Sequence, residues 1–162
     1  MGRLKALFLA AWCLATTLLA GCGDPATLTL SDGERRELSD YRGRWLVVNY
    51  FAEWCAPCLR EMPLLNELNE LNELNEQHNA EGPVVLAVSF DALPAAELER
   101  LKTDYRMTMP VAASLEGPWP FETPRMLPTT LVLDPRGKLV DRHQGELKAE
   151  DLARWQDIYW GD

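Results

Sequence analysis

Short runs of apolar, β-branched and aromatic residues recur along the chain and predict buried β-strands. Residues 45–51 and 84–90 are almost continuously apolar, which is typical of strands covered on both faces of a sheet. Residues 129–133 and 139–143 are two further strand-like segments, separated by a turn at residues 134–138. The chain should therefore contain a buried sheet with a hairpin near its C-terminal end.

Three amphipathic segments predict helices that alternate with these strands. Residues 58–77 follow the first buried strand, residues 94–106 follow the second, and residues 148–160 lie near the end of the chain. This alternation is typical of a single α/β domain. The side chains expected on the inner faces are Leu98, Leu101 and Tyr105 in the second helix and Leu152, Trp155, Ile158 and Tyr159 in the third.

Shorter elements are predicted at both sides of the first buried strand and helix. Residues 27–30 and 36–38 flank the sequence Ser31-Asp32-Gly33, and an Asp-Gly pair between two strand-like segments predicts a small hairpin. Residues 109–111 predict a short strand segment, whereas the proline-rich residues 117–121 predict an irregular loop.

The first predicted helix ends in a repeat, because residues 65–76 consist of four copies of Leu-Asn-Glu. A period of three turns the leucine stripe by about 60° per copy relative to an α-helix. Leu65, Leu68, Leu71 and Leu74 therefore cannot all face one core. We interpret the repeat as an extended amphipathic flank, with a partner-binding helix as the alternative.

The N-terminal residues have the pattern of an export signal. Arg3 and Lys5 precede an apolar stretch at residues 7–20, which is too short to span a membrane comfortably. The following Leu19-Ala20-Gly21-Cys22 resembles a bacterial lipobox, which predicts cleavage before a lipid-modified Cys22. An uncleaved N-terminal anchor is the alternative, and both place the domain outside the cytoplasm.

Three segments follow from this interpretation: a lipoprotein signal peptide at residues 1–21, a linker at 22–26 and one domain at 27–160. The expected location is the periplasmic face of a bacterial membrane. Gly23 rather than aspartate follows Cys22, so the sequence leaves open whether that membrane is the inner or the outer one.

Charge excludes one class of partner. The full chain has a formal net charge of −9, and removal of the basic signal leaves 14 basic and 25 acidic residues, a net charge of −11. Such an acidic domain is unsuited to bind nucleic acid. It also offers no polybasic patch for lipid headgroups, so membrane attachment would depend on the lipid at Cys22.

Cys55 and Cys58 lie where the first buried strand gives way to a helix. Cys55 would occupy the helix N-terminus, where free N–H groups and the helix dipole lower the pKa of a thiol and favour a nucleophilic thiolate. Cys58 follows one turn later, in a position to attack a mixed disulfide at Cys55. Pro57 fits the first turn, where its missing N–H removes no helical hydrogen bond.

Other uses of a C-x-x-C pair fit this chain less well. His78 and His143 have no zinc-ligand spacing relative to the pair, so we expect no metal site. Haem attachment requires histidine directly after the second cysteine, where this chain has Leu59. A purely structural disulfide remains an alternative, although so small a loop adds little stability.

Three motifs together resemble the thioredoxin superfamily. They are Trp54-Cys55-Ala56-Pro57-Cys58, Pro63 in the following helix, and Leu127-Pro128-Thr129-Thr130. Within that superfamily, residues 27–160 resemble the exported TlpA/ResA-like thiol-disulfide reductases. The features that support this are the preceding hairpin, Val48-Asn49-Tyr50-Phe51 before the cysteines, and residues 128–134 near the end. This resemblance implies a thioredoxin-like α/β fold, with a central mixed sheet flanked by helices and an N-terminal β-hairpin extension.

The resemblance also assigns roles within the site. Cys55 would be the attacking thiol and Cys58 the resolving thiol, and their redox-active disulfide would be the sole redox group, with no further cofactor. The peptide bond before Pro128 would be cis, beside the dithiol. The residues expected to support the site are Trp54, Ala56, Pro57, Leu127, Pro128 and Asn49.

Two positions depart from the thioredoxin pattern. Asn49 occupies the place of a buried aspartate that aids proton transfer, and the lysine partner of that aspartate would fall near Ala87. Proton transfer must therefore use water or another group; Glu53 and Glu61 are candidates, although we interpret both as solvated carboxylates. In the proline-rich loop, where relatives often carry a short helix, Trp119 and Phe121 are interpreted as packing residues, with substrate contact as the alternative.

The function expected from these features is an enzyme: a lipid-anchored periplasmic thiol-disulfide oxidoreductase that reduces disulfides of exported proteins. A membrane electron-relay protein would regenerate its dithiol. A peroxiredoxin-like peroxidase is one alternative, but it requires Thr-x-x-Cys, and Ala52 lies three residues before Cys55. A non-catalytic binding module with a thioredoxin fold is another, and it would not need both thiols.

Overall fold

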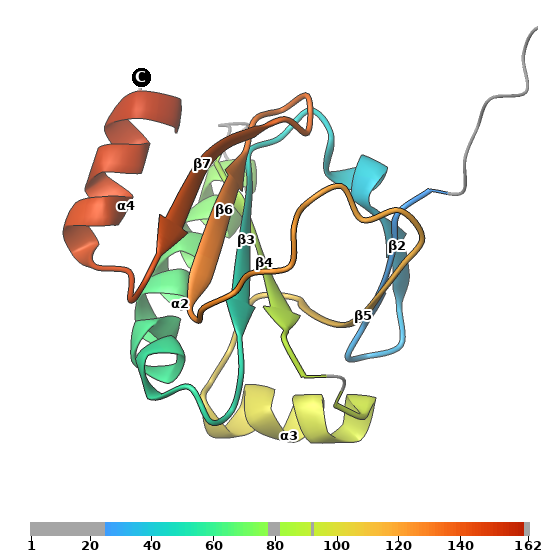
Figure 1. Ribbon diagram of the computed structural model, residues 1–162. Coiled ribbons are helices and arrows are strands. Elements are labelled where there is room, and N and C mark those ends of the chain that lie inside the picture. Colours follow the sequence, from blue (N-terminus) through green and yellow to red (C-terminus); the bar gives the residue numbers. More distant parts are fainter. Residues whose placement is uncertain (1–24, 78–81, 92, 161–162) are drawn as a thin grey trace, which may run out of the picture.

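Seven strands form one mixed sheet in the computed structural model, which describes residues 25–77, 82–91 and 93–160 (Figure 1). The strand order is β2-β1-β5-β4-β3-β6-β7. The lipobox and Cys22 lie outside the described residues. The strands are β1 Thr27–Leu30, β2 Arg35–Glu37, β3 Leu46–Phe51, β4 Val84–Ser89, β5 Val111–Glu116, β6 Thr129–Leu133 and β7 Leu139–Gln144.

Strand β3 lies in the interior of the sheet, and all six of its residues are buried. It pairs in parallel with β4 and antiparallel with β6. Asn49 in the middle of β3 is opposite Ala87 on one side and Thr130 on the other. The nearly continuous apolar sequence of β3 and β4 is thus explained by burial on both faces, as predicted.

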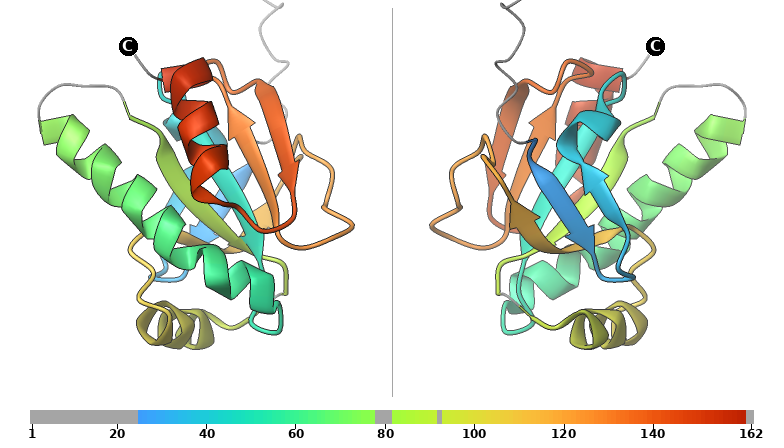
Figure 2. Two further views of the ribbon diagram at one scale, coloured as in Figure 1. Left: turned by 90° about the vertical axis from the view of Figure 1, so that its left-hand side faces the viewer. Right: turned by 90° about the vertical axis from the view of Figure 1, so that its right-hand side faces the viewer.

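Helices cover one face of this sheet. Helices α2 (Ala56–Gln77) and α4 (Ala149–Trp155) cross the same face, and α3 (Ala95–Asp104) lies near one end of it (Figure 2). The core on this side contains both cysteines of the C-x-x-C pair together with Trp155. The opposite face is covered by the 3-10 helix η1 (Leu38–Tyr41) and by side chains of the proline-rich loop.

The N-terminal hairpin extends the sheet at the side away from α4. Strand β1 pairs antiparallel with both β2 and β5, and Gly33 in the connecting turn has a φ of 89°. A left-handed conformation there explains the glycine of the predicted Asp-Gly turn. The start of β1 lies at the opposite corner of the molecule from the end of β3, where α2 begins (Figures 1 and 2).

The Leu-Asn-Glu repeat leaves the core gradually, as its period predicts. Leu65 and Leu68 are buried in α2, whereas Leu71 is 48% exposed. The side chain of Leu74 lies outside the described part of the chain. The end of α2 extends past the sheet (Figure 2).

Two side chains predicted to face inward are exposed. Tyr105 is 36% exposed, because α3 ends at Asp104 and the helical spacing does not continue to Tyr105. Ile158 is 61% exposed, because the chain after α4 forms a π-helical turn, η2 (Gln156–Trp160). The wider turn breaks the 3.6-residue spacing on which the prediction depended.

Candidate active site

The sheet and α2 together position a disulfide between Cys55 and Cys58, whose Cα atoms are 5.3 Å apart. Cys55 directly precedes the first residue of α2, and Cys58 lies in its first turn. Cys55 is 4% exposed and Cys58 is fully buried. The backbone N–H of Cys58 points at Sγ of Cys55, with an N to S distance of 3.3 Å. This N–H and the helix dipole would stabilise a thiolate at Cys55 after reduction.

Exposed apolar side chains surround this end of the sheet. Trp54 is 67% exposed, and its indole Nε1 donates a hydrogen bond of 2.8 Å to Oδ2 of Asp91. Phe90 follows β4, and its backbone N–H bonds to the carbonyl of Phe51. Both Phe90 and Met126 are exposed. Three exposed apolar side chains, those of Trp54, Phe90 and Met126, therefore lie at this end of the sheet.

The peptide bond between Leu127 and Pro128 is cis, which confirms the prediction from the sequence. Thr129 is opposite Tyr50 in the register of β6 and β3. Pro128 therefore lies next to the end of β3, from which the chain runs into Cys55. The register thus places the Leu127-Pro128 segment at the same end of the sheet as the dithiol.

A buried carboxylate lies one turn beyond Cys58. Glu61 is fully buried, and its Oε1 accepts a hydrogen bond of 2.7 Å from Nδ2 of Asn49. Its Oε2 accepts another, of 2.6 Å, from the backbone N–H of Leu147. The interpretation of Glu61 as a solvated carboxylate was therefore wrong. The i, i+3 spacing from Cys58 was the signal that could have placed it on the inner face of α2.

Burial raises the pKa of Glu61 to about 7, and the nearby charge of Glu146 acts in the same direction. The hydrogen bonds from Leu147 and Asn49 lower the pKa and partly offset burial. Glu61 can therefore exchange a proton near neutral pH. Glu53, the other candidate, pairs with Arg100 at the surface, with 3.1 Å between Oε1 and Nη2.

The two buried polar partners Asn49 and Thr130 link Glu61 to the sheet. Asn49 is fully buried, and its Nδ2 also donates a hydrogen bond of 3.0 Å to Oγ1 of Thr130. Ala87, near which the lysine partner of the thioredoxin aspartate would fall, is buried and apolar. The acid of this site, Glu61, thus comes from α2, and β3 contributes the amide of Asn49 instead of an acid.

Burial of Glu61 predicts a pH dependence of stability. Its pKa rises from 4.5 to about 7 on folding, so the native state holds the proton more tightly. The stabilisation is fully present below pH 4.5 and is lost as pH rises through 7, by about 3 kcal/mol in total. We expect the oxidised protein to lose this stability between pH 5 and 8 in urea unfolding, and Glu61→Gln to remove the loss. Glu53→Gln is the matched surface control, and an equal pH dependence in wild type and Glu61→Gln would contradict the prediction.

The proline-rich loop packs on the sheet. Nε1 of Trp119 donates a hydrogen bond of 2.8 Å to the hydroxyl of Tyr50, and Phe121 meets Trp119 edge to face, with 5.4 Å between ring centroids. Both rings pack against the core cluster on the face opposite α2 and α4. This arrangement supports the packing interpretation over substrate contact.

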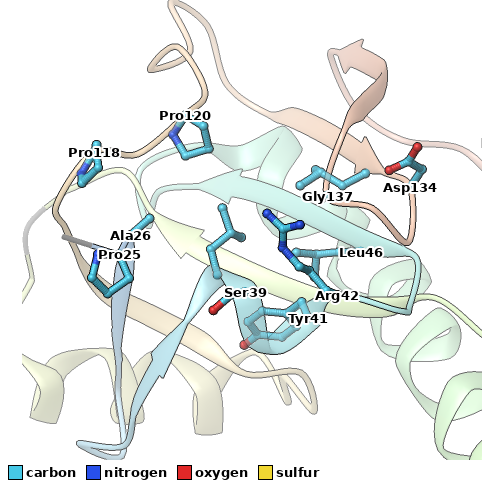
Figure 3. Close-up of a pocket in the computed structure, with 12 residues that line it drawn as sticks. Pro25, Ala26, Ser39, Tyr41, Arg42, Leu46, Pro118, Pro120, Asp134 and Gly137 are labelled. Atoms are coloured by element: carbon cyan, nitrogen blue, oxygen red, sulfur yellow. The ribbon is translucent and has the colours of Figure 1, made fainter. Parts of the chain in front are cut away.

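A cavity of about 310 Å³ lies beside this loop, between η1 and the loop prolines (Figure 3). Neither Cys55 nor Cys58 lines it. Its walls are mostly apolar, so it is separate from the redox site in both place and chemistry. The residues that line it include Pro25, Ala26, Tyr41, Arg42, Leu46, Pro118, Pro120 and Leu133.

Two negative findings concern the described residues. In residues 25–77, 82–91 and 93–160, no group of three or more His, Cys, Asp or Glu side chains could hold a metal ion. No helix in that same part of the chain has both the length and the apolar character needed to cross a membrane.

Comparison with known proteins identifies similar chains. The chain is 33% identical over 136 residues to the thiol-disulfide oxidoreductase ResA of Geobacillus thermodenitrificans, covering 77% of this chain and 70% of the relative. It is 29% identical over 132 residues to the thioredoxin-like protein YneN of Bacillus subtilis, covering 80% and 73%. A secreted thiol-disulfide isomerase from Corynebacterium glutamicum has a similar fold, with a TM-score of 0.65, 20% identity, and coverage of 85% and 83%.

A family model covers most of the described domain. It matches residues 23–142, from the linker into β7, and therefore includes the C-x-x-C pair, Glu61 and the cis-proline segment. On this match and the fold described above, the chain belongs to the AhpC/TSA family, in its thioredoxin-like form.

Proposed function

We propose that the protein is a thiol-disulfide oxidoreductase that reduces disulfides of exported proteins by dithiol exchange. The observation that carries this proposal is the Cys55–Cys58 disulfide at the start of α2, with the N–H of Cys58 pointing at Cys55 Sγ. The relatives named thiol-disulfide oxidoreductases support it.

The reaction begins with the reduced dithiol. The thiolate of Cys55 attacks a client disulfide, so that one client sulfur bonds to Cys55 and the other leaves as a thiolate. Cys58 then loses its proton and attacks Cys55 Sγ, which forms the Cys55–Cys58 disulfide and releases the second client thiolate. Two electrons pass from the dithiol to the client, and protons from the medium complete the client thiols.

Glu61 is the group that we assign to the proton of Cys58. It is buried with Cys58 and lies one helical turn away, and its pKa of about 7 allows it to accept and release a proton at neutral pH. Arg60, on the neighbouring surface, is held by Glu146, with 3.1 Å between Nε and Oε1. The charge of Arg60 is therefore paired with the carboxylate of Glu146 and not with that of Glu61.

The direction of electron flow follows from these charges. Glu61 is acidic, and no histidine adds a positive partner within the C-x-x-C motif. Negative charge disfavours the thiolate form and so favours the disulfide, which makes the pair a reductant. We expect a potential of roughly −270 mV, nearer that of thioredoxin than the strongly oxidising end at about −120 mV. Equilibration with glutathione buffers measures it, and a value above about −180 mV would contradict the reductase assignment.

Insulin reduction separates this function from its rivals. A peroxidase of the peroxiredoxin type needs a threonine where this chain has the buried, apolar Ala52, and a binding module would not turn over. Turnover of insulin disulfides with a reductant supports the proposal. Absence of turnover in the reduced wild-type protein would refute it.

Attachment to a membrane is a separate part of the proposal. Cys22 in the lipobox would carry diacylglycerol at the periplasmic face of the membrane, and a membrane electron-relay protein would then regenerate the dithiol. Cells fed labelled palmitate should incorporate it into wild type and not into Cys22→Ser, with Cys55→Ser as the control for an unrelated cysteine. Label that persists in Cys22→Ser would refute the anchor.

A further inference from the structure

Asn49 has an unbalanced set of hydrogen bonds for a fully buried amide. Its Nδ2 donates to Oε1 of Glu61 at 2.7 Å and to Oγ1 of Thr130 at 3.0 Å. Its Oδ1 is buried and has no hydrogen-bond partner in the described part of the chain. A buried acceptor without a donor costs free energy, so the rest of the arrangement must favour this orientation.

The reason for the observed orientation of the Asn49 amide appears when it is compared with the orientation in which Oδ1 and Nδ2 are exchanged. Turning the amide would place Oδ1 against Oε1 of Glu61 and leave two N–H donors where no acceptor lies. An ionised carboxylate accepts hydrogen bonds and cannot donate them, so it requires the N–H side of Asn49. The observed orientation therefore fits Glu61 in its ionised form.

We propose that Asn49 is a positioning residue for proton transfer, whose amide, fixed by Thr130, favours the ionised form of Glu61, the form that can accept the proton of Cys58. This inference rests on the proposed dithiol exchange. In that step the Sγ–H bond of Cys58 breaks and an Oε–H bond forms on Glu61. The negative charge moves from the carboxylate to the sulfur, and Glu61 later returns the proton to the medium.

The physical reason lies in two opposed effects on Glu61. Burial alone would keep this carboxyl protonated at neutral pH, and a protonated carboxyl cannot take another proton. A hydrogen bond donated to the ionised form is stronger than one donated to the neutral form, so Asn49 opposes protonation. Asn49 therefore brings the proton affinity of Glu61 back into the range where exchange with Cys58 is possible.

Few other groups act on Glu61. The loop between β7 and α4 contributes the N–H of Leu147, which donates to Oε2, and the charge of Glu146, which Arg60 of α2 pairs with. The C-x-x-C segment at the start of α2 adds Cys55 and Cys58, which do not titrate in the disulfide form. Strands β3 and β6 contribute Asn49 and Thr130, which carry no charge. The effect of Asn49 can thus be measured in the oxidised protein without interference from the thiols.

The test compares Asn49→Leu with wild type and with Asn69→Leu. Asn69 is another buried amide, in α2, and controls for the general effect of replacing a buried amide by leucine. The readout is the carboxyl carbon signal of Glu61 in the oxidised protein, followed by NMR from pH 5 to 10. We expect the midpoint in Asn49→Leu to rise by about one pH unit, because one hydrogen bond to a charged group is lost. The rising limb of the pH profile of insulin reduction should move upward by the same amount.

An unchanged or lowered midpoint in Asn49→Leu, or an equal rise in Asn69→Leu, would overturn the proposal. Thr130→Val keeps the shape of the side chain but removes the hydroxyl that fixes the amide, so a smaller rise is expected there. If Asn49→Leu does not fold, the Thr130→Val titration decides, and no rise would overturn the proposal. Because the titration needs no turnover, its result is independent of whether wild type reduces insulin, which tests the proposed function itself.

Discussion

Serine in place of Cys55 is expected to lower insulin-reduction turnover by about 1,000-fold or more, to the rate of the reductant alone. Cys55 is the thiol at the start of α2, and the N–H of Cys58 points at its sulfur. A serine hydroxyl is not ionised there and cannot form a disulfide with the client. Turnover with purified variants at pH 7 measures the effect, with Cys22→Ser as the control that keeps the dithiol. Retention of substantial activity in Cys55→Ser would show that the attacking thiol is elsewhere.

Serine in place of Cys58 should also abolish turnover, but unlike Cys55→Ser it should leave clients trapped as mixed disulfides. Cys55 can still attack, but the mixed disulfide cannot be resolved from within, because the resolving sulfur is gone. Clients should therefore stay attached to Cys58→Ser and be released by added thiol, as seen on non-reducing gels. The Cys55→Ser variant is the matched control and should trap none. If Cys55→Ser traps more clients than Cys58→Ser, the two roles are reversed.

Removal of the acid from Glu61 should slow the reaction by about 100-fold or more at neutral pH, within the range for general acid and base catalysis. Glutamine fills the same buried space, but its amide offers an acceptor oxygen to only one of the two donors, Asn49 and Leu147, and it cannot take the proton of Cys58. Wild-type turnover should rise as pH increases through about 7, because Glu61 then becomes an ionised base. In Glu61→Gln this rise should be absent.

The matched control for this effect is Glu53→Gln, because Glu53 is a surface carboxylate paired with Arg100. Its turnover and its pH profile should equal those of wild type. A Glu61→Gln profile that keeps the rise near pH 7 would show that another group accepts the proton.

Much of the fold was predictable from short-range patterns in the sequence. The continuous apolar sequence of β3 and the Asp-Gly turn before β2 are local signals that tertiary structure did not override. Ile158 shows the limit of such signals. The π-helical turn that follows α4 shifts the spacing of inward-facing side chains, and no residue type in the sequence indicates such a turn.

The candidate site shows the same division. The positions of the two cysteines and of the cis proline depend on motifs within a few residues, and the sequence contains them. Burial of Glu61 depends on Asn49, twelve residues earlier, and on the backbone of Leu147, 86 residues later. A charged residue in a helix is usually solvated, so the pattern alone favoured the wrong interpretation. Only the assembled sheet and loop provide the donors that allow a carboxylate to be buried there.

If the protein is anchored through Cys22, as proposed above, the position of the start of β1 at the corner opposite the dithiol determines how it would meet its partners (Figure 1). Three residue steps separate Cys22 from Pro25, a reach of about 11 Å at most. A lipid at Cys22 would thus hold the β1 corner close to the bilayer, and the dithiol end of the sheet would then face the aqueous compartment. Water-soluble clients would reach that end freely. The electron donor, in contrast, would need cysteines on a domain that extends from the membrane far enough to reach Cys55 and Cys58. Thiols within the plane of the bilayer would contact only the β1 corner.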